Sequence, residues 1–213
     1  MTCKSPSGLC DQTTCEVSGG CAWGGVMDAT KFWAGEGGDA YLKRNRVDWR
    51  ARIPFWSRVI GLTGARSVLE LGCNAGWNLS AIRRAYPDVQ VYGNDVNLPA
   101  FVQAKTAGIE YGNMMTVNRH ELVFTAGVLI HVPGDGLRDV MQMLIDASCH
   151  YVLAVEYEAD EETEIEYRGQ MGLLWKRPYG QLYQNMGLKL VEQWAPHEVH
   201  GFDRCTAWLL EKS

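Results

Sequence analysis

The chain has 213 residues, of which 46% are hydrophobic and 21% are charged, and its formal net charge is −5 at pH 7. This length and composition fit one α/β domain with a short extension, and they exclude a chain that is disordered throughout. The acidic balance disfavours a protein that holds nucleic acid through an excess of basic residues.

Residues 1–27 are rich in Gly, Ser, Thr and Cys and show no helical or strand periodicity, so they are predicted to form an N-terminal extension to a domain at 28–213. The first residues lack the apolar core of a signal peptide, and the apolar run at 122–132 is too short to span a bilayer. A cytoplasmic protein without membrane contact is therefore expected.

Four of the seven cysteines lie in the extension: Cys3, Cys10, Cys15 and Cys21. Four thiolates suffice for a closed tetrahedral zinc site, although their spacing lacks the Cys-x-x-Cys pairs of common zinc modules. A zinc site and a loose or disulfide-linked tail both remain open.

Residues 28–62 are predicted to be helical in two pieces, 39–47 and 48–60, with a kink or break at Pro54. Basic side chains gather here, and they indicate either the solvated face of a helix or a contact with nucleic acid. The cluster consists of Lys43, Arg44, Arg46, Arg50, Arg52 and Arg58.

From residue 66 onward, short apolar strands alternate with helices, and this rhythm predicts a parallel sheet with helices on both faces. Strands are expected at 67–71, 89–93, 109–111, 122–126 and 151–157, and helices at 78–86, 98–107 and 137–148. Two further strands, at 188–195 and 206–211, have no room for a crossover helix between them and should form an antiparallel edge pair.

The strongest signal is the run Glu70-Leu71-Gly72-Cys73-Asn74-Ala75-Gly76 after the first strand. Gly72 and Gly76 would let the backbone approach a ligand closely, because glycine has no Cβ. The run lacks the G-x-G-x-x-G pattern that cradles a pyrophosphate. It suits S-adenosylmethionine, which has no phosphate and needs backbone contacts to its amino-acid portion.

Polar residues also follow the next two strands. Asp95 ends the second strand, where a carboxylate can accept hydrogen bonds from ribose hydroxyls, and Asn113 with Met114 follows the third, where they could flank adenine. Ligands of such folds bind at the carboxyl ends of the strands, so the three features should meet.

The stretch 124–133 resembles the fourth motif of class I S-adenosylmethionine-dependent methyltransferases. More narrowly, the chain resembles the pseudaminic acid biosynthesis-associated methylase family. The matching pieces are Phe32-Trp33-Ala34-Gly35-Glu36, Gly38-Asp39-Ala40-Tyr41, Arg44-Asn45, the loop through Trp77-Asn78-Leu79, Val128 to Pro133, Tyr167-Arg168-Gly169 and Trp175-Lys176-Arg177. The resemblance implies a Rossmann-like fold with a mostly parallel seven-stranded sheet, and a small, sugar-like or acidic acceptor.

The resemblance also implies roles for individual residues around the cofactor. Glu70, Gly72, Asn74 and Gly76 would line its methionine end, Asp95 and Val96 its ribose side, and Asn113 and Met114 its adenine. Thr125, Ala126 and Ile130 would lie under the sulfonium, and Trp33, Tyr41 and Asn45 would close over the site.

On the acceptor side, His131 follows the fourth strand and is a candidate general base, because the ordinary pKa of imidazole is about 6.5. Its alternative role is structural. Glu156 and Tyr157 end the fifth strand and should face the same crevice.

An acidic run from Glu156 to Glu166 indicates a solvated loop, a cationic acceptor or a divalent metal site. Arg168, Lys176 and Arg177 follow it, and they would either hold an acidic acceptor or pair with the acidic run.

The sequence therefore predicts a methyltransferase that acts on oxygen or nitrogen of a small polar acceptor. A methyltransferase for nucleic acid or a modified nucleotide, and a domain that binds the cofactor without turnover, are the alternatives. The oligomeric state is left open.

Overall fold

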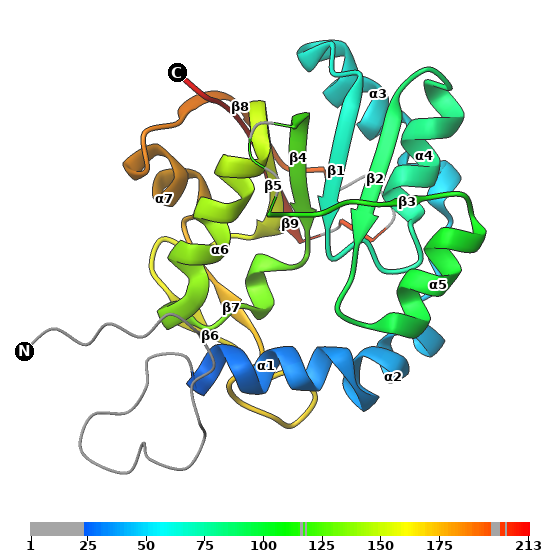
Figure 1. Cartoon of the computed structure of the whole chain (residues 1–213). Coiled ribbons are helices and arrows are strands. Elements are labelled where there is room, and N and C mark those ends of the chain that lie inside the picture. The colour runs from blue at the N-terminus through cyan, green and yellow to red at the C-terminus, as the bar shows by residue number, and fades with distance from the viewer. Residues whose placement is uncertain (1–23, 116, 118, 197–200, 203) are drawn as a thin grey trace, which may run out of the picture.

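Figure 1 shows the computed structural model of the chain, which describes residues 24–115, 117, 119–196, 201–202 and 204–213. Its N-terminal part is helical, with α1 (Gly24–Ala34), α2 (Glu36–Arg44), the 3-10 helix η1 (Trp49–Arg52) and α3 (Ile53–Thr63). The sequence predicted two helical pieces and a kink at Pro54. Pro54 instead lies in the first turn of α3, where its missing amide hydrogen breaks no helical bond.

The main sheet has seven strands in the order β3-β2-β1-β4-β5-β9-β8. The strands are β1 (Ser67–Leu71), β2 (Gln90–Asn94), β3 (Glu110–Tyr111), β4 (His120–Ala126), β5 (Ser148–Tyr157), β8 (Lys189–Trp194) and β9 (Cys205–Glu211). The first five are parallel to one another, whereas β9 is antiparallel to both β5 and β8. The predicted fold, a mostly parallel sheet with an antiparallel pair at its C-terminal edge, is confirmed.

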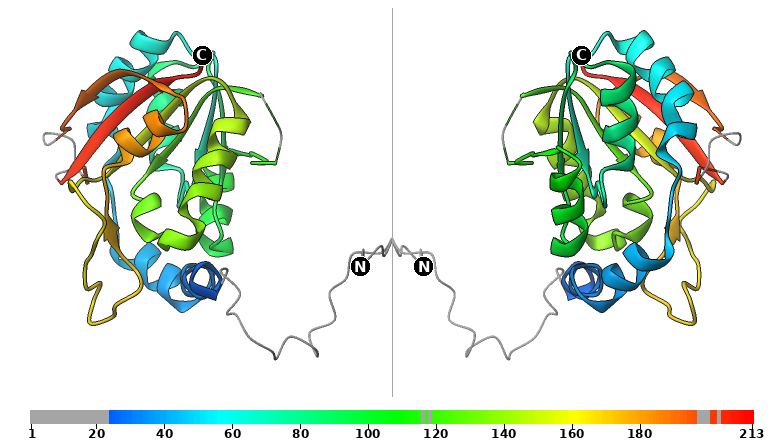
Figure 2. Two further views of the ribbon diagram at one scale, coloured as in Figure 1. Left: turned by 90° about the vertical axis from the view of Figure 1, so that its left-hand side faces the viewer. Right: turned by 90° about the vertical axis from the view of Figure 1, so that its right-hand side faces the viewer.

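Helices cover both faces of this sheet, as the two views of Figure 2 show. They include α4 (Trp77–Ala85), α5 (Leu98–Thr106), α6 (Gly134–Ala147) and α7 (Tyr179–Asn185). Neighbouring side chains of a strand point to opposite faces, so Val68 joins the core under α3 and α4 while Leu69 joins the core under α6 and α7. Both side chains are fully buried, which explains the continuous apolar character of β1.

The parallel strands end at one edge of the sheet, and α1 and α2 lie across this edge (Figure 1). The attachment of α2 is polar: the buried side chain of Asn97 donates from Nδ2 to Asp39 Oδ1 at 2.8 Å. Asn97 also caps α5, because its Oδ1 accepts from the amide of Ala100 at 2.9 Å. One asparagine thus joins the N-terminal helices to the end of β2.

The connection after β5 forms a small second sheet that the sequence did not predict. Its strands are β6 (Thr163–Glu164) and β7 (Trp175–Lys176), which pair antiparallel. The chain continues beyond β6 to Tyr167, whose ring lies 5.7 Å from the ring of Trp33 in α1. The connection therefore reaches the N-terminal helices at the carboxyl edge of the main sheet.

Candidate active site

A cavity of about 610 Å³ lies at the carboxyl ends of β1, β2, β4 and β5. Twelve of the sequence-predicted site residues line it: Trp33, Tyr41, Asn45, Glu70, Gly72, Asn74, Asp95, Val96, Ala126, Ile130, His131 and Tyr157. Cavities of this size are typical of small-molecule sites, and this position is where α/β sheets bind ligands.

The turn after β1 is shaped by backbone conformations that favour glycine and asparagine. Gly72 has φ 70° and Asn74 has φ 48°, and a Cβ at Gly72 would lie 2.5 Å from a methyl group of Val128. The amide of Asn74 donates to Asp95 Oδ2 at 2.8 Å, and the amide of Asn97 donates to Asp95 Oδ1 at 2.8 Å. These two bonds fix the carboxylate at the cavity wall and leave lone pairs on both oxygens.

Glu70 presents a buried carboxylate to the cavity, and its two oxygens differ in their hydrogen bonds among the described residues. Its Oε1 accepts from Asn78 Nδ2 at 2.6 Å, and Asn78 Oδ1 in turn accepts from Arg52 Nη1 at 2.7 Å. The other oxygen, Oε2, is buried without a hydrogen-bond partner among the described residues. Burial raises the pKa of Glu70 to about 8. A buried acceptor left open in a cavity fits a cationic group of a ligand, such as an ammonium.

Gly76 has a role different from the one predicted. It does not line the cavity, and a Cβ there would lie 2.8 Å from Ile109 and 3.2 Å from Ala104. Glycine at this position lets α4 start in a left-handed conformation, φ 76°, while α5 packs closely against it. The close approach that the structure shows at Gly76 is to Ile109 and Ala104 of the protein's own core.

Three other predicted cofactor residues also lie away from the cavity lining. The Asn113 side chain is exposed, and its Oδ1 accepts from the amide of Met115 at 2.9 Å. This local hydrogen bond stabilises the turn that begins at Asn113. Met114 packs in the core with Leu69, and Thr125 is fully buried in β4. Thr125 is buried because β4 is covered on both faces of the sheet, with Val123 in one core and Phe124 in the other.

Sequence reasoning gave no site role to several residues that line the cavity, among them Arg52, Asn78, Asn97 and Phe202. Asn78 and Asn97 closely follow the predicted glycine turn and Asp95, and an asparagine before Leu98-Pro99 is typical of a helix N-cap. Arg52 and Phe202 reach the cavity through tertiary packing, and the guanidinium of Arg52 lies 4.2 Å from the ring centroid of Phe202.

His131 lies in the 3-10 helix η2 (Leu129–His131) and lines the cavity. Its Nδ1 is 2.6 Å from the carbonyl oxygen of Leu173. A carbonyl only accepts, so Nδ1 carries the proton and the Nε2 lone pair is left as an acceptor. Burial lowers the pKa of His131 to about 4, and the ring is therefore neutral near pH 7.

Glu156 does not face the crevice as predicted, because its fully buried carboxylate turns to the backbone of η2. Oε1 accepts from the amides of Val128 and Leu129, each at 3.2 Å, and Oε2 accepts from the amide of Ile130 at 3.3 Å. Burial raises its pKa to about 7. Glu156 positions η2, and thereby His131, without lining the cavity.

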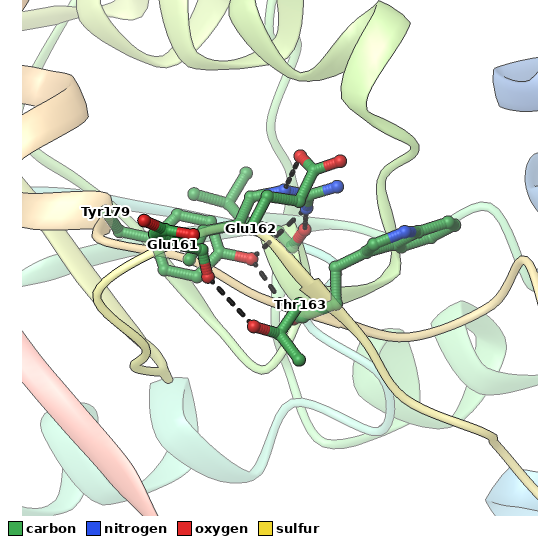
Figure 3. Close-up of polar contacts among 7 residues, drawn as sticks. Glu161, Glu162, Thr163 and Tyr179 are labelled. Carbon is green, nitrogen blue, oxygen red and sulfur yellow. Dashed lines mark hydrogen bonds and ion pairs between the residues drawn. The ribbon is translucent and has the colours of Figure 1, made fainter.

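The three cations expected to hold an acidic acceptor are also outside the cavity lining. Arg177 is 1% exposed, and its Nε lies 2.6 Å from Glu162 Oε2, so it pairs with the acidic run. Figure 3 shows Glu162 in this network with Glu161, Thr163 and Tyr179. Arg168 is exposed in a left-handed turn with φ 53°, and Lys176 lies in β7 opposite Thr163.

The proposed zinc ligands Cys3, Cys10, Cys15 and Cys21 lie outside the described residues. Within the described part of the chain, no group of three or more His, Cys, Asp or Glu side chains could hold a metal ion. The acidic run from Glu156 to Glu166 lies entirely within the described residues, so nothing supports a divalent metal bound by its carboxylates.

The residues of the basic cluster near the N-terminal helices differ in burial and in their partners. Arg52 is buried, Arg44 Nη2 donates to the hydroxyl of Tyr167 at 2.6 Å, and Arg58 pairs with Glu192. These three arginines make contacts within the protein, whereas Lys43, Arg46 and Arg50 are exposed. Among the helices described, none is both long and apolar enough to cross a membrane.

Several solved structures share this fold at low sequence identity. The magnesium protoporphyrin IX methyltransferase from Synechocystis, with bound S-adenosylmethionine, has a TM-score of 0.62 and 10% identity, over 89% of this chain and 97% of that chain. The 1,6-didemethyltoxoflavin-N1-methyltransferase from Burkholderia thailandensis, with bound S-adenosylhomocysteine, has a TM-score of 0.64 and 14% identity, over 87% of each chain. The CcbJ methyltransferase from Streptomyces caelestis has a TM-score of 0.57 and 18% identity, over 79% of this chain and 97% of that chain.

No protein-family model matches the chain, and no curated protein matches it. The narrower resemblance to the pseudaminic acid biosynthesis-associated methylases therefore stays a prediction. The strand order and the solved structures establish that the chain has the Rossmann-like fold of class I S-adenosylmethionine-dependent methyltransferases.

Proposed function

We propose that this protein is an S-adenosylmethionine-dependent methyltransferase that acts on oxygen or nitrogen of a small polar molecule. One observation carries the proposal: two carboxylates at the ends of neighbouring strands, Glu70 and Asp95, line one cavity, and Glu70 keeps a buried oxygen without a partner among the described residues. Two solved structures of the same fold, which match 89% and 87% of this chain, contain bound S-adenosylmethionine or its demethylated product.

The cavity residues fit the parts of this cofactor in the order of the strands. Glu70 would accept from the cofactor's ammonium, the backbone of the turn at Gly72 and Asn74 would contact its amino-acid portion, and Asp95 would accept from the ribose hydroxyls. Val96, whose apolar side chain is 53% exposed at the cavity, would pack on the adenine.

When bound, the cofactor supplies a methyl group on a sulfonium, and the new bond to the acceptor forms as the carbon–sulfur bond breaks, with its electron pair staying on sulfur. The protein's own contribution is alignment of the acceptor and acceptance of its proton. His131 and Tyr157 both line the cavity. The Nε2 lone pair of His131 and the hydroxyl group of Tyr157 can each form a hydrogen bond with a hydroxyl or amine of the acceptor. His131 and Tyr157 are therefore the proposed contacts at the reacting atom.

Calorimetry with S-adenosylhomocysteine tests the proposal. We expect saturable binding by the wild-type protein and a loss of about tenfold or more in Asp95→Ala, because the ribose then loses charge-assisted hydrogen bonds worth roughly 1.5–3 kcal/mol. Asp88→Ala, at an exposed position after α4, is the matched control and should bind like wild type. No binding by the wild-type protein would remove the methyl donor and with it the proposed activity.

A further inference from the structure

Four aromatic rings from separate segments gather at the cavity. Trp33 comes from α1, Tyr41 from α2, His131 from η2 and Tyr167 from the connection after β6, and all four line the cavity. The ring centroid of Trp33 lies 4.2 Å from that of His131, 5.7 Å from that of Tyr41 and 5.7 Å from that of Tyr167. We refer to these four residues as the aromatic chamber.

The wall around the aromatic chamber is apolar. Val132, Val140, Met143 and Leu174 line the cavity beside it. The charged side chains among the described lining residues are Glu70, Asp95 and Arg52, and Arg52 is bound to Asn78, the partner of Glu70. Glu70 and Asp95 thus belong to the side of the cavity that the proposed function gives to the cofactor. Arg52 interacts electrostatically with both Glu70 and Tyr41, and the interaction with Glu70 is the larger of the two.

Besides the two tyrosine hydroxyl groups, the aromatic chamber contains an indole donor and an imidazole acceptor. The indole Nε1 of Trp33 is buried and has no hydrogen-bond partner among the described residues. The Nε2 of His131 is an acceptor, because Nδ1 of the same ring donates to Leu173. A buried indole N–H without a partner costs free energy unless a ligand accepts from it.

Arg44 holds the chamber closed at Tyr167. Its Nη2 donates to the Tyr167 hydroxyl at 2.6 Å, and its guanidinium lies 5.2 Å from the ring centroid of Tyr41. Because Arg44 is engaged with two chamber residues and does not line the cavity, it is not placed to hold an acidic group inside it.

We infer that the aromatic chamber binds an uncharged planar ring that carries the accepting hydroxyl or N–H group, and not a sugar acid. This inference rests on the proposed function. A flat ring buries its faces against aromatic side chains, and its hydroxyl or N–H can donate to His131 Nε2 while a ring heteroatom or oxygen accepts from Trp33 Nε1. A cationic acceptor would also be attracted by aromatic faces, but the positively charged sulfonium of the donor would repel it.

Binding of three probes to the full chain saturated with S-adenosylhomocysteine tests this inference. The probes are 2-naphthol as an uncharged ring, N-acetylneuraminic acid as a sugar acid and tetramethylammonium as a cation. The cation is measured with S-adenosylmethionine in place of S-adenosylhomocysteine, because only S-adenosylmethionine carries the sulfonium charge that would repel it. We expect 2-naphthol to bind at least ten times more tightly than the other two by calorimetry. Tighter binding of the sugar acid or the cation would overturn the inference.

Variants locate the probe. Trp33→Leu and Tyr167→Leu should each weaken 2-naphthol binding by about fivefold, because each removes an aromatic contact worth roughly 0.5–1.5 kcal/mol. Tyr111→Leu, at an aromatic side chain that is 65% exposed in β3 and outside the cavity lining, is the matched control and should leave the affinity unchanged. Equal affinities in wild type, Trp33→Leu and Tyr167→Leu would contradict the inference.

The same experiment separates the two proposals. If the wild-type protein does not bind S-adenosylhomocysteine, the proposed function fails. If it binds S-adenosylhomocysteine but not 2-naphthol, the proposed function stands and only the aromatic acceptor is rejected. Because Tyr167 lies in a connection outside the main sheet, Tyr167→Leu keeps the test open if Trp33→Leu does not fold.

Discussion

At the scale of single residues, Glu70 is the group whose protonation responds most directly to a bound cation. Its carboxyl is buried, and its pKa is raised to about 8, so it carries a proton at pH 7 in the unliganded protein. A cationic group beside it would favour the carboxylate. We therefore expect S-adenosylhomocysteine to release about one proton when it binds at pH 7.

The proton released by Glu70 can be measured by calorimetry in buffers of different ionisation enthalpy, such as phosphate and Tris. Glu70→Gln keeps the shape of the side chain and the acceptor oxygen toward Asn78 but cannot titrate, so its binding should release no proton. Equal proton release in wild type and Glu70→Gln would show that another group titrates.

His131 should make the fold sensitive to acid. Its pKa in the folded protein is lowered to about 4, below its ordinary value of 6.5, so the unfolded chain binds more protons between these two values. The stability from the neutral ring is fully present above about pH 6.5 and is lost as the pH falls toward 4. Between pH 7 and pH 5 we expect this group to account for about 1–2 kcal/mol of lost unfolding free energy.

Urea unfolding at pH 7 and pH 5 measures this loss. His131→Gln should lose less stability over the interval than wild type, whereas His150→Gln, at an exposed position in β5, should behave like wild type. The idea fails if wild type and His131→Gln lose the same stability.

At the scale of elements, an ion pair between the buried Arg177 and the half-exposed Glu162 holds the connection after β5 against the site. Arg177 Nε binds Glu162, and Arg177 Nη1 donates to the carbonyl oxygen of Leu129 in η2 at 3.2 Å. The guanidinium of Arg177, which directly follows β7, thus joins η2 to the residue that directly precedes β6. Figure 3 shows the Glu162 side of this network. Glu162 is half exposed, which weakens the pair through solvent screening.

Glu162→Gln should therefore lower the unfolding free energy by about 1–2 kcal/mol, because Arg177 stays buried with a neutral partner. Glu161→Gln is the matched control. The side chain of Glu161 is exposed, and only its backbone carbonyl is bonded, to Thr163 Oγ1 at 3.1 Å, so its stability should stay within about 0.5 kcal/mol of wild type. Chemical denaturation would compare the three proteins, and equal losses in both variants would argue against a specific pair.

At the scale of the whole molecule, the cavity connects the N-terminal helices, the sheet edge and the connection after β5, so a ligand there should stabilise the domain as a unit. With S-adenosylhomocysteine at a hundredfold excess over Kd, we expect about 2.7 kcal/mol of stabilisation and a rise in Tm of roughly 5–10 °C. Differential scanning calorimetry checks this shift. Asp95→Ala at the same ligand concentration should shift less, and equal shifts would place the ligand elsewhere.

The strand and helix pattern was predictable because it depends on local spacing. β1 was predicted with its observed bounds, and the glycine turn, Asp95 and His131 were predicted at strand ends that the structure brings together. The parallel sheet follows from the same alternation, since strands joined by helices run in one direction. The fold and the position of this cavity at the strand ends thus followed from periodicity and turn chemistry in the sequence.

Side-chain direction and distant partners were decided only by the tertiary structure. Gly76 and Glu156 occur where ligand contacts were expected. In the structure, Gly76 leaves room for the close packing of α5, and the Glu156 carboxylate accepts hydrogen bonds from amides of η2. The partner of Arg177 was left open by the sequence, because which charge lies near it depends on how the chain folds back. The aromatic chamber likewise joins Trp33 to Tyr167 across the chain, and no local pattern encodes a contact whose two sides are brought together by the packing of the whole domain.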